Sequence, residues 1–358
     1  MGDVFAGRYE LVDPLGEGGT GVVWRVWDHR HQQYAAAKVL RQVDASSLLR
    51  FMREQSLRLE HPHILTPTGW AGEDDKVLFT MPIASGGSVA TLISDYGPLP
   101  VRLTAELLDQ LLSALEATHA QNVIHRDVKP ANLLLDATGT GHPWLWLGDF
   151  GIAAGGDAPR LTQGPYTVGT PGYVAPEAFE LGWQPTPAAD LYAAGMCAVE
   201  MLTGAHPAPD ADIATLLAAA HREEPVPDSL VAVVAQLGHA TVNERYAHAG
   251  EARAELRATG LLEPLEAHRL LGDVEVFDHT PALPHGWSEH GPTEVDDADP
   301  SIAAPPMAAA PTVSTMPPPP PPQQRHEPAR KMRAVALAAI LMGLGVVLIA
   351  VSLFVVFG

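Results

Sequence analysis

The first quarter of the chain alternates apolar and polar positions with the period of β-strands. Between residues 8 and 40, aromatic and β-branched side chains alternate with polar ones, and turn-forming residues separate the runs. This pattern predicts three antiparallel strands. A short apolar run over 76–81, followed by a Gly-Gly loop, predicts a further strand.

The pattern then changes to the helical period. Helical spacing over 48–60 ends at a His-Pro pair, and most of 188–258 also has helical spacing. Between 100 and 121 the apolar residues that recur every three or four positions are Leu103, Leu107, Leu108, Leu111, Leu112 and Leu115. A β-rich part followed by an α-rich part predicts an α+β fold with two lobes.

Beyond the helical part, composition predicts a linker over 259–333. Acidic clusters come first, and a proline run over 317–322 follows. Proline-rich polar sequence cannot bury enough apolar surface to fold, so we expect a disordered, semi-rigid spacer. An SH3-type ligand is the alternative for the proline run. Residues 261–287 keep several apolar side chains, and the sequence leaves open whether they pack on the folded domain.

Residues 334–357 form an uncharged, almost wholly apolar run of 24 residues. As a helix this run would be about 36 Å long, enough to cross a bilayer. Three cations, Arg330, Lys331 and Arg333, precede it, and the positive-inside rule then places the N-terminal domain in the cytoplasm. We therefore expect a single-pass C-terminal membrane anchor, with a buried helix of a soluble protein as the alternative. Small residues at 339 and 343 are compatible with a homodimer.

Charge and cysteine content exclude some classes of protein. The chain has 22 Lys and Arg against 42 Asp and Glu, a net charge of −20. Nucleic-acid binding requires clustered cations, so we expect no nucleic-acid partner. Cys197 is the only cysteine and lies in an apolar run, which predicts a buried core residue and excludes an intrachain disulfide.

A glycine-rich segment near the N-terminus has the pattern G-x-G-x-x-G-x-V over 16–23. Glycines at these positions allow backbone N–H groups to approach phosphate oxygens. A dinucleotide-binding turn shares the pattern but needs a helix directly after the third glycine. Here residues 22–26 read as a strand, which favours a β-hairpin over the phosphates. Lys38 follows between apolar strand residues, where we expect it to pair with phosphates and an acidic partner.

A second segment, His125 to Asn132, reads HRDVKPAN and brings a carboxylate, a cation and an amide into one loop. Asp149-Phe150-Gly151 follows a short strand-like stretch and supplies another carboxylate. Phosphoryl transfer requires a positioned hydroxyl, a divalent metal ion and neutralised phosphate charge. These residue types are suited to that chemistry.

With these motifs in this order, the chain resembles the eukaryotic-like (Hanks-type) protein kinases, in particular their bacterial Ser/Thr branch. The resemblance covers residues 8–258 and includes the GTPGYVAPE segment at 169–177. It implies a bilobal protein-kinase fold that uses ATP and Mg²⁺, with Mn²⁺ as an alternative ion. The DxKPxN pattern is similar to that of Ser/Thr kinases, so the substrates implied are proteins.

The resemblance also implies roles for single residues. Asp127 would orient the substrate hydroxyl and accept its proton, and Lys129 would contact the γ-phosphate. Lys38 would contact the α- and β-phosphates, and Asn132 and Asp149 would hold the metal. The implied nucleotide-contacting residues are Leu15, Gly16, Glu17, Gly18, Gly19, Thr20, Gly21, Val22, Val23, Ala36, Lys38, Ala84 and Leu134.

One helix residue departs from the family pattern. Glu54 resembles the glutamate that pairs with the strand lysine, but its distance to His61-Pro62 is shorter than usual by about half a helical turn. Glu60 is the alternative partner. Three further residues, Glu177, Arg245 and Asp190, resemble structural supports of the family.

Regulation is implied by Arg126, which directly precedes Asp127 and can pair with a phosphate on the activation loop. Thr162 and Thr167 are the candidate phosphosites, and Thr162 is preferred. Thr170 is expected to hold the substrate loop near Asp127. In the linker, Thr293 with Asp296 resembles a phosphothreonine ligand of forkhead-associated domains, whereas an unmodified acidic linker is the alternative.

Two other functions compete with an active protein kinase. A pseudokinase scaffold would be expected to lack Lys38, Asp127 or Asp149, and all three are present. A small-molecule phosphotransferase would share the catalytic loop but would not need GTPGYVAPE. The sequence therefore favours a membrane-anchored Ser/Thr kinase that is activated by phosphorylation of its own loop.

Overall fold

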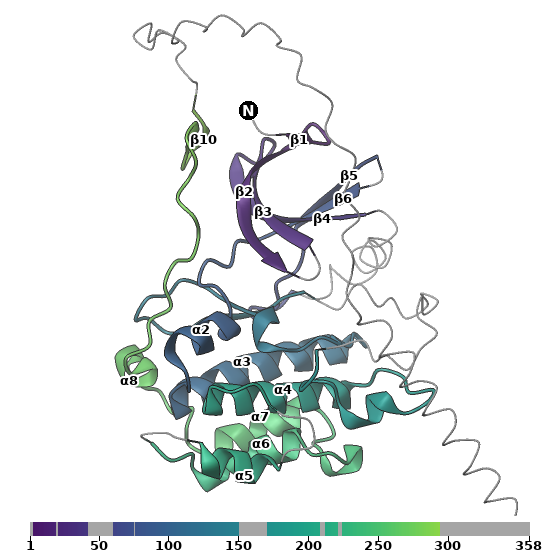
Figure 1. Ribbon diagram of the computed structural model, residues 1–358, viewed down its shortest axis with the longest axis vertical. Coiled ribbons are helices and arrows are strands. Elements are labelled where there is room, and N and C mark those ends of the chain that lie inside the picture. Colours follow the sequence, from purple (N-terminus) through teal and green to yellow (C-terminus); the bar gives the residue numbers. More distant parts are fainter. Residues whose placement is uncertain are drawn as a thin grey trace, which may run out of the picture. The chain divides into compact units, whose positions relative to one another are not determined.

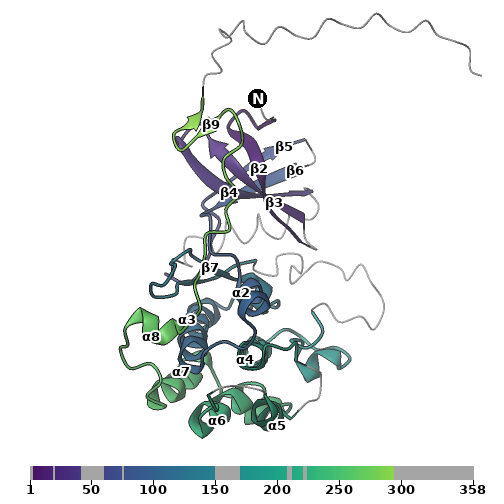
Figure 2. The same ribbon diagram turned by 60° about the vertical axis from the view of Figure 1, so that its left-hand side comes forward.

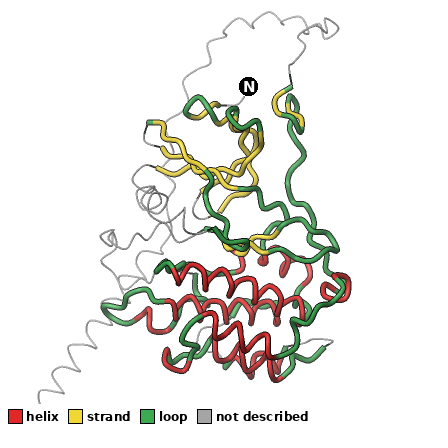
Figure 3. The backbone as a smooth tube through the Cα atoms, turned by 180° about the vertical axis from the view of Figure 1, so that it is seen from behind, coloured by secondary structure: helices red, strands yellow, loops and turns green. Residues whose placement is uncertain are grey.

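The structure is a computed structural model that describes residues 3–18, 21–41, 60–74, 76–149, 170–207, 212–220 and 224–293. Within these ranges the chain forms a strand-rich N-lobe (residues 3–81) and a helical C-lobe (residues 89–258), which Figure 3 distinguishes by colour. Residues 82–88, here named the hinge, connect them. The predicted α+β bilobal fold is confirmed for this part of the chain.

The N-lobe is built on one antiparallel sheet with the strand order β1-β2-β3-β4-β6-β5 (Figure 1). The strands are β1 (Val4–Phe5), β2 (Tyr9–Gly18), β3 (Gly21–Asp28), β4 (Gln33–Arg41), β5 (Gly69–Glu73) and β6 (Lys76–Met81). β3 starts at Gly21, so a strand and not a helix follows the glycine-rich turn. This excludes the dinucleotide-binding alternative for that motif.

The two faces of this sheet have different tasks because side chains alternate along each strand. One face carries Val26, Ala37 and Leu78, which pack with Phe5 and Tyr9 into a small apolar core. In the register of β3 with β4, Val23 pairs with Lys38 and Arg25 with Ala36, so these four side chains share the opposite face. That face, here named the cleft face, carries Val23, Ala36 and Lys38 of the predicted nucleotide contacts.

The C-lobe consists mainly of helices and two short strands. They are α2 (Val89–Tyr96), α3 (Val101–Ala120), η2 (Pro130–Asn132), β7 (Leu133–Leu135), β8 (Leu145–Leu147), η3 (Pro176–Phe179), α4 (Pro187–Thr203), α5 (Ile213–Ala219), α6 (Asp228–Leu237), η4 (Val242–Glu244) and α7 (Ala249–Ala258). The predicted helix over 100–121 is α3, and its periodic leucines are fully buried.

α3 and α4 pack against each other in the C-lobe, and Figure 1 shows them side by side; Figure 2 shows the same helices turned by 60°. α4 is rich in alanine and contains Gly195, where an added Cβ would lie 2.6 Å from the backbone of Gly238. The small residue therefore allows α6 to approach closely. Cys197 on α4 is fully buried, and burial raises the pKa of its thiol, which confirms the core role predicted for it.

The packed part of the chain extends beyond residue 258, where the sequence predicted the start of a linker. The helix α8 (Ala267–Leu271) and the hairpin of β9 (Trp287–Ser288) with β10 (Gly291–Pro292) follow, and both belong to the same compact unit as the two lobes. The predicted boundary rested on Gly260 and Pro264, which end α7 without ending the fold. Buried Leu270, Leu271 and Val276 explain why this segment packs.

The described ranges, which end at Thr293, contain no helix long and apolar enough to cross a membrane. The predicted anchor over 334–357 and most of the predicted linker lie outside these ranges. Both remain predictions.

Candidate active site

The loop that carries Asp127 is fixed from below by one buried carboxylate. Asp190, near the start of α4, is 1% exposed and accepts hydrogen bonds from the backbone N–H groups of His125 at 2.8 Å and Arg126 at 2.9 Å. His119, on α3, donates its Nε2–H to the same carboxylate at 2.8 Å. The prediction that Asp190 supports this loop agrees with this geometry.

Two residues of the site have a backbone conformation that favours glycine. Arg126 has φ of 72° and Asp149 has φ of 54°. Such conformations cost roughly 1–3 kcal/mol each and persist only where the surroundings impose them. For Arg126 the bonds to Asp190 supply that constraint, so the strain fixes the direction of the next side chain, Asp127.

The carboxylate of Asp127 is held by two neighbours. The amide of Asn132 donates from Nδ2 to its Oδ2 at 2.9 Å and to its backbone carbonyl at 2.7 Å. Lys129 lies with Nζ 2.8 Å from the same Oδ2 and 3.2 Å from the hydroxyl of Thr170. One carboxylate oxygen is thus occupied, and the residue is held in one orientation next to the GTPGYVAPE segment.

Lys38 and Asp149 form a second pair, between the lobes. The Nζ of Lys38 lies 2.6 Å from Oδ1 of Asp149, and the lysine side chain is 11% exposed. Lys38 comes from β4 and Asp149 follows β8, so the pair joins the sheet of the N-lobe to the C-lobe. Asp149 is therefore an acidic partner of Lys38 in this structure, whereas Glu54, the partner expected from the sequence, lies outside the described residues.

His125 connects the two loops of the site. It is fully buried and donates from Nε2 to the carbonyl of Gly148 at 2.9 Å, and its Nδ1 accepts the N–H of Asp127 at 3.4 Å. Burial lowers the pKa of this imidazole, which keeps it neutral and able to act as donor and acceptor at once. The position of Asp149 is in this way coupled to that of Asp127.

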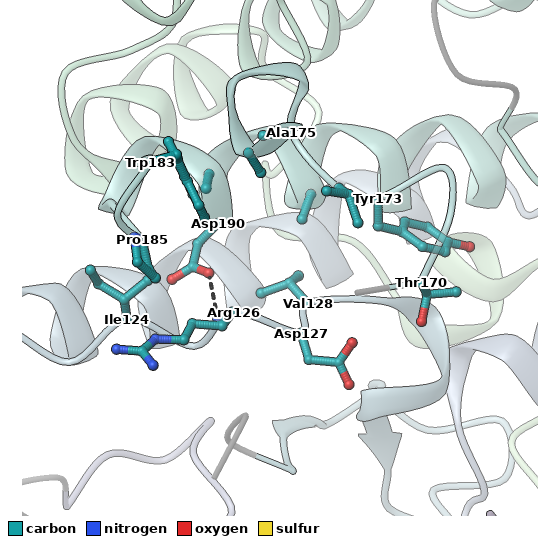
Figure 4. A pocket seen from close by; sticks show the side chains of 14 residues that line it. Ile124, Arg126, Asp127, Val128, Thr170, Tyr173, Ala175, Trp183, Pro185 and Asp190 are labelled. Carbon is teal, nitrogen blue, oxygen red and sulfur yellow. Dashed lines mark hydrogen bonds between the residues drawn. The ribbon is translucent and has the colours of Figure 1, made fainter. Parts of the chain in front are cut away.

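A pocket opens beside Asp127, and Figure 4 shows its lining. Asp127, Val128 and Thr170 line one part, and Arg126, Trp183 and Asp190 line another. In Figure 4 the side chains of Arg126 and Asp127 point to different ends of the pocket. The pocket adjoins the GTPGYVAPE segment, so a peptide hydroxyl could reach Asp127 from this side.

That segment is itself attached to the C-lobe. Tyr173 donates its hydroxyl proton to Glu200, near the end of α4, and packs edge-on against His206. Gly172 has φ of +90°, and a Cβ there would lie 2.8 Å from His206. These contacts hold the segment's backbone close to α4.

A bidentate ion pair closes the segment at its C-terminal end. The two terminal nitrogens of the Arg245 guanidinium, Nη1 and Nη2, each lie 2.7 Å from one carboxylate oxygen of Glu177, and the arginine side chain is fully buried. Arg245 also donates to the carbonyls of Ala188 and His239. The pairing expected for these two residues is present. The guanidinium N–H groups bond Glu177 and backbone carbonyls, so Arg245 has a structural role.

Of the predicted nucleotide contacts, Val23, Ala36 and Lys38 lie on the cleft face of the sheet. Val23 is opposite Lys38, and Ala36 is opposite Met81 at the end of β6. From the C-lobe, Leu134 packs against Gly148, where an added Cβ would be 3.1 Å from its side chain. Ala84 lies in the hinge. These side chains come from both lobes, as an adenine pocket requires.

Several predicted residues lie outside the described residues. They are Gly19, Thr20, Glu54, Phe150, Gly151, Thr162 and Thr167. Glu60, the alternative partner of Lys38, is described and is exposed. Nothing in the described structure decides between the two glutamates.

The donor set fits a magnesium nucleotide. Because the amide nitrogen of Asn132 makes both bonds to Asp127, its oxygen is directed elsewhere and can ligate a cation. The carboxylate of Asp149 is 41% exposed, and oxygen ligands of this kind suit Mg²⁺. Lys38 adds the positive charge that phosphates need.

Two supports of the site were missed by sequence reasoning. His119 was not singled out, although its place near the end of the long leucine-rich helix could have suggested contact with the next loop. The connection from His125 to Gly148 joins residues 23 positions apart, and no local pattern predicts it.

Comparison with known proteins gives the same family that the motifs indicated. Residues 9–249 match the protein kinase domain family. The chain is 40% identical to the serine/threonine-protein kinase PkaA of Streptomyces coelicolor over 216 residues, which is 56% of this chain and 39% of that protein. It is 37% identical to PknD of Mycobacterium tuberculosis over 226 residues, which is 62% of this chain and 33% of PknD.

A third relative, PknA of Mycobacterium tuberculosis, is 33% identical over 237 residues, 63% of this chain and 54% of PknA. The matched part thus spans between a third and about half of these relatives. Its extent agrees with the lobes described above, and the resemblance inferred from the motifs is confirmed. The chain belongs to the protein kinase domain family, among bacterial kinases of the eukaryotic-like serine/threonine type.

Proposed function

We propose that this protein is a Ser/Thr protein kinase that transfers the γ-phosphate of ATP to protein hydroxyls. The observation that carries the proposal is the position of Asp127. Its carboxylate is held by Asn132 and by Lys129, which also contacts Thr170, on a loop that Asp190 supports from a buried position. Family membership and the names of the relatives support the same function.

The mechanism follows from the roles of the side chains. Asp127 orients the substrate hydroxyl and accepts its proton, while Lys129 stabilises charge that develops on the transferred group. Lys38 binds the α- and β-phosphates, and Asn132 and Asp149 hold the divalent ion. When bound, ATP supplies the γ-phosphoryl group and leaves as ADP, and Mg²⁺ neutralises negative charge on the phosphate oxygens. The protein contributes chiefly position and electrostatics.

The contact between Lys129 and Thr170 supports specificity for Ser and Thr. It ties the substrate loop to the catalytic loop at 3.2 Å. A short aliphatic hydroxyl must come close to Asp127 to react, so a loop held near that carboxylate favours Ser and Thr over the longer Tyr.

We also propose activation by phosphorylation of the protein's own loop, preferably at Thr162. Arg126 lies in the pocket beside Asp127, and its backbone is fixed by Asp190. A phosphate bound by Arg126 would order the loop through charge-assisted hydrogen bonds.

Thr162→Ala should therefore lower kinase activity at least tenfold, whereas Thr167→Ala, as the matched variant, should lower it less. Mass spectrometry of the full-length protein after incubation with ATP and Mg²⁺ measures the phosphosites. Equal activity of Thr162→Ala and the parent would contradict this proposal.

We further propose that residues 334–357 anchor the protein in the cell membrane with the kinase domain in the cytoplasm. The support is the uncharged run of 24 residues and the cations before it. Replacing Leu341 and Val347 together by Arg should move the protein from the membrane to the soluble fraction in a bacterial host. The same double change to Ala is the control, and retention of the Arg variant in the membrane would refute the anchor.

The remaining partners stay predictions. Thr293, the candidate ligand of a forkhead-associated domain, is exposed at the end of the last described range. The small residues at 339 and 343 that suggested a homodimer lie outside the described residues.

A further inference from the structure

The match to the kinase family ends at residue 249 in the C-lobe, but the described chain continues beyond it and packs on both lobes. After α8 it turns at Gly272, passes the hinge and reaches the N-lobe, as the green segment in Figures 1 and 2 shows. Figure 3 shows the same path from behind. Residues 272–293 are here named the strap.

The strap first contacts the C-lobe and the hinge. Val276 and Gly139 exchange two backbone hydrogen bonds of 3.0 Å, and Tyr96 on α2 bonds the backbone of Glu275. The N–H of His279 then donates to the carbonyl of Ser85 at 2.8 Å. Ser85 directly follows Ala84, the predicted backbone contact of adenine. The strap is therefore fixed to the hinge itself.

Next the strap contacts the N-lobe through Arg25 on β3. This guanidinium is 6% exposed, forms a bidentate pair with Asp13, and donates to the carbonyl of Pro281 at 3.0 Å and, more weakly, to that of Ala282 at 3.4 Å. Arg25 shares the cleft face of the sheet with Val23, Ala36 and Lys38. The strap thus meets the N-lobe on the side where the nucleotide is proposed to bind.

The end of the strap is packed on aromatic side chains. Tyr34 donates its hydroxyl proton to the carbonyl of Ser288 at 2.6 Å, and its ring lies 6.2 Å from that of Trp287. Gly291 has φ of +104°, and a Cβ there would lie 2.5 Å from the ring of Trp27. Trp27 is 2% exposed, and the hairpin of β9 and β10 packs directly on its ring.

We propose that the strap holds the N-lobe at a set position over the C-lobe and thereby determines how tightly the cleft binds nucleotide. The part concerning nucleotide rests on the proposed function. Its physical basis is that the strap, covalently continuous with the C-lobe, is held to the hinge and to the N-lobe by hydrogen bonds and packing, and so forms a second, non-covalent connection beside residues 82–88. A hinge alone permits rotation, whereas two connections that are both packed restrict it.

The test uses two glycine substitutions at positions that both have a positive φ. Gly291→Ala adds a methyl group against Trp27. Gly286→Ala, in the same segment, has φ of +89° and nothing within 4 Å of its added Cβ. Strain at a positive φ is common to both variants, so a difference between them reports the contact with the N-lobe. Both are made in the full-length protein.

The first measurement is the distance between spin labels on the two lobes, by double electron–electron resonance. Arg30→Cys and Glu255→Cys provide exposed labelling sites, and buried Cys197 will not react. We expect a narrow distance distribution for the parent and for Gly286→Ala, and a broad one for Gly291→Ala. Equal widths in all three proteins would overturn the proposal.

Hydrogen exchange and nucleotide affinity complete the test. Peptides that cover 276–293 should exchange about tenfold faster in Gly291→Ala than in Gly286→Ala. The dissociation constant for a non-hydrolysable ATP analogue with Mg²⁺ should be about three- to tenfold higher in Gly291→Ala than in Gly286→Ala. If the parent does not bind the analogue, the proposed function fails, but the label distances still show whether the strap restricts the position of the N-lobe. A detached strap with unchanged affinity would refute its role in nucleotide binding.

Discussion

Replacing Asp127 by Asn is expected to lower the rate of phosphoryl transfer about 10²- to 10⁴-fold, because the amide cannot accept the proton of the substrate hydroxyl. The shape of the side chain and an oxygen acceptor for Asn132 are retained, so the fold and nucleotide affinity should hardly change. Initial rates with saturating ATP, together with calorimetric titration of an ATP analogue, measure both quantities.

Asp95→Asn is the matched control. Asp95 lies on α2, is exposed and has no part in the proposed mechanism, yet the substitution removes the same charge. Its rate should equal that of the parent. If Asp127→Asn retained most of the parent activity, Asp127 would not be the base, and the central role given to it would be wrong.

Asp190→Ala should have the second large effect, and on stability as well as on activity. The buried carboxylate accepts from two backbone N–H groups and from His119. Removal leaves these buried donors without an acceptor at about 1–3 kcal/mol for each. We expect a loss of about 3–5 kcal/mol in the free energy of unfolding, measured in urea.

The catalytic loop would also lose its support, so the fraction that remains folded should show reduced activity. Asp190→Asn keeps one oxygen acceptor and should lie between the parent and Asp190→Ala in both measurements. If Asp190→Ala unfolded at the same urea concentration as the parent, the hydrogen bonds described here would not stabilise the loop.

The two lobes and the catalytic loop could be predicted from the sequence because their signals are local. Alternation over residues 8–40 gave β2 to β4, and the leucine spacing over 100–121 gave α3. Asp127, Lys129 and Asn132 lie within six residues of one another, so their contact follows from chain connectivity. Lys38 could be assigned because a lysine between apolar strand residues needs a partner.

Contacts between distant parts of the chain could not be predicted in this way. Arg25 and Pro281 are separated by 256 residues, and nothing near either indicates the other. The apolar residues of 261–287 left open whether this segment packs on the domain, and gave no sign of the surface it would cover. Gly260 and Pro264 did end a helix, yet a helix end is not a domain end when buried side chains follow.

The partner of Lys38 illustrates the same limit. Resemblance to the family's helix glutamate favoured Glu54, although its spacing is unusual, and the described structure shows Asp149 beside the lysine at 2.6 Å. Glu54 lies outside the described residues, so Asp149 is a partner that the structure adds, and the pairing of Lys38 with Glu54 stays a prediction. Local pattern identifies the residue types of this site, and tertiary packing selects the pairs.

The most direct measurement of the central claim is phosphoamino-acid analysis after incubation of the full-length protein with γ-labelled ATP, Mg²⁺ and an unstructured protein substrate that offers Ser, Thr and Tyr. We expect label on Ser and Thr of the substrate with the parent protein, and about 10²- to 10⁴-fold slower labelling with Asp127→Asn. No label with the parent, in a sample that binds the nucleotide, would contradict it and favour a scaffold that binds ATP without transferring its phosphate.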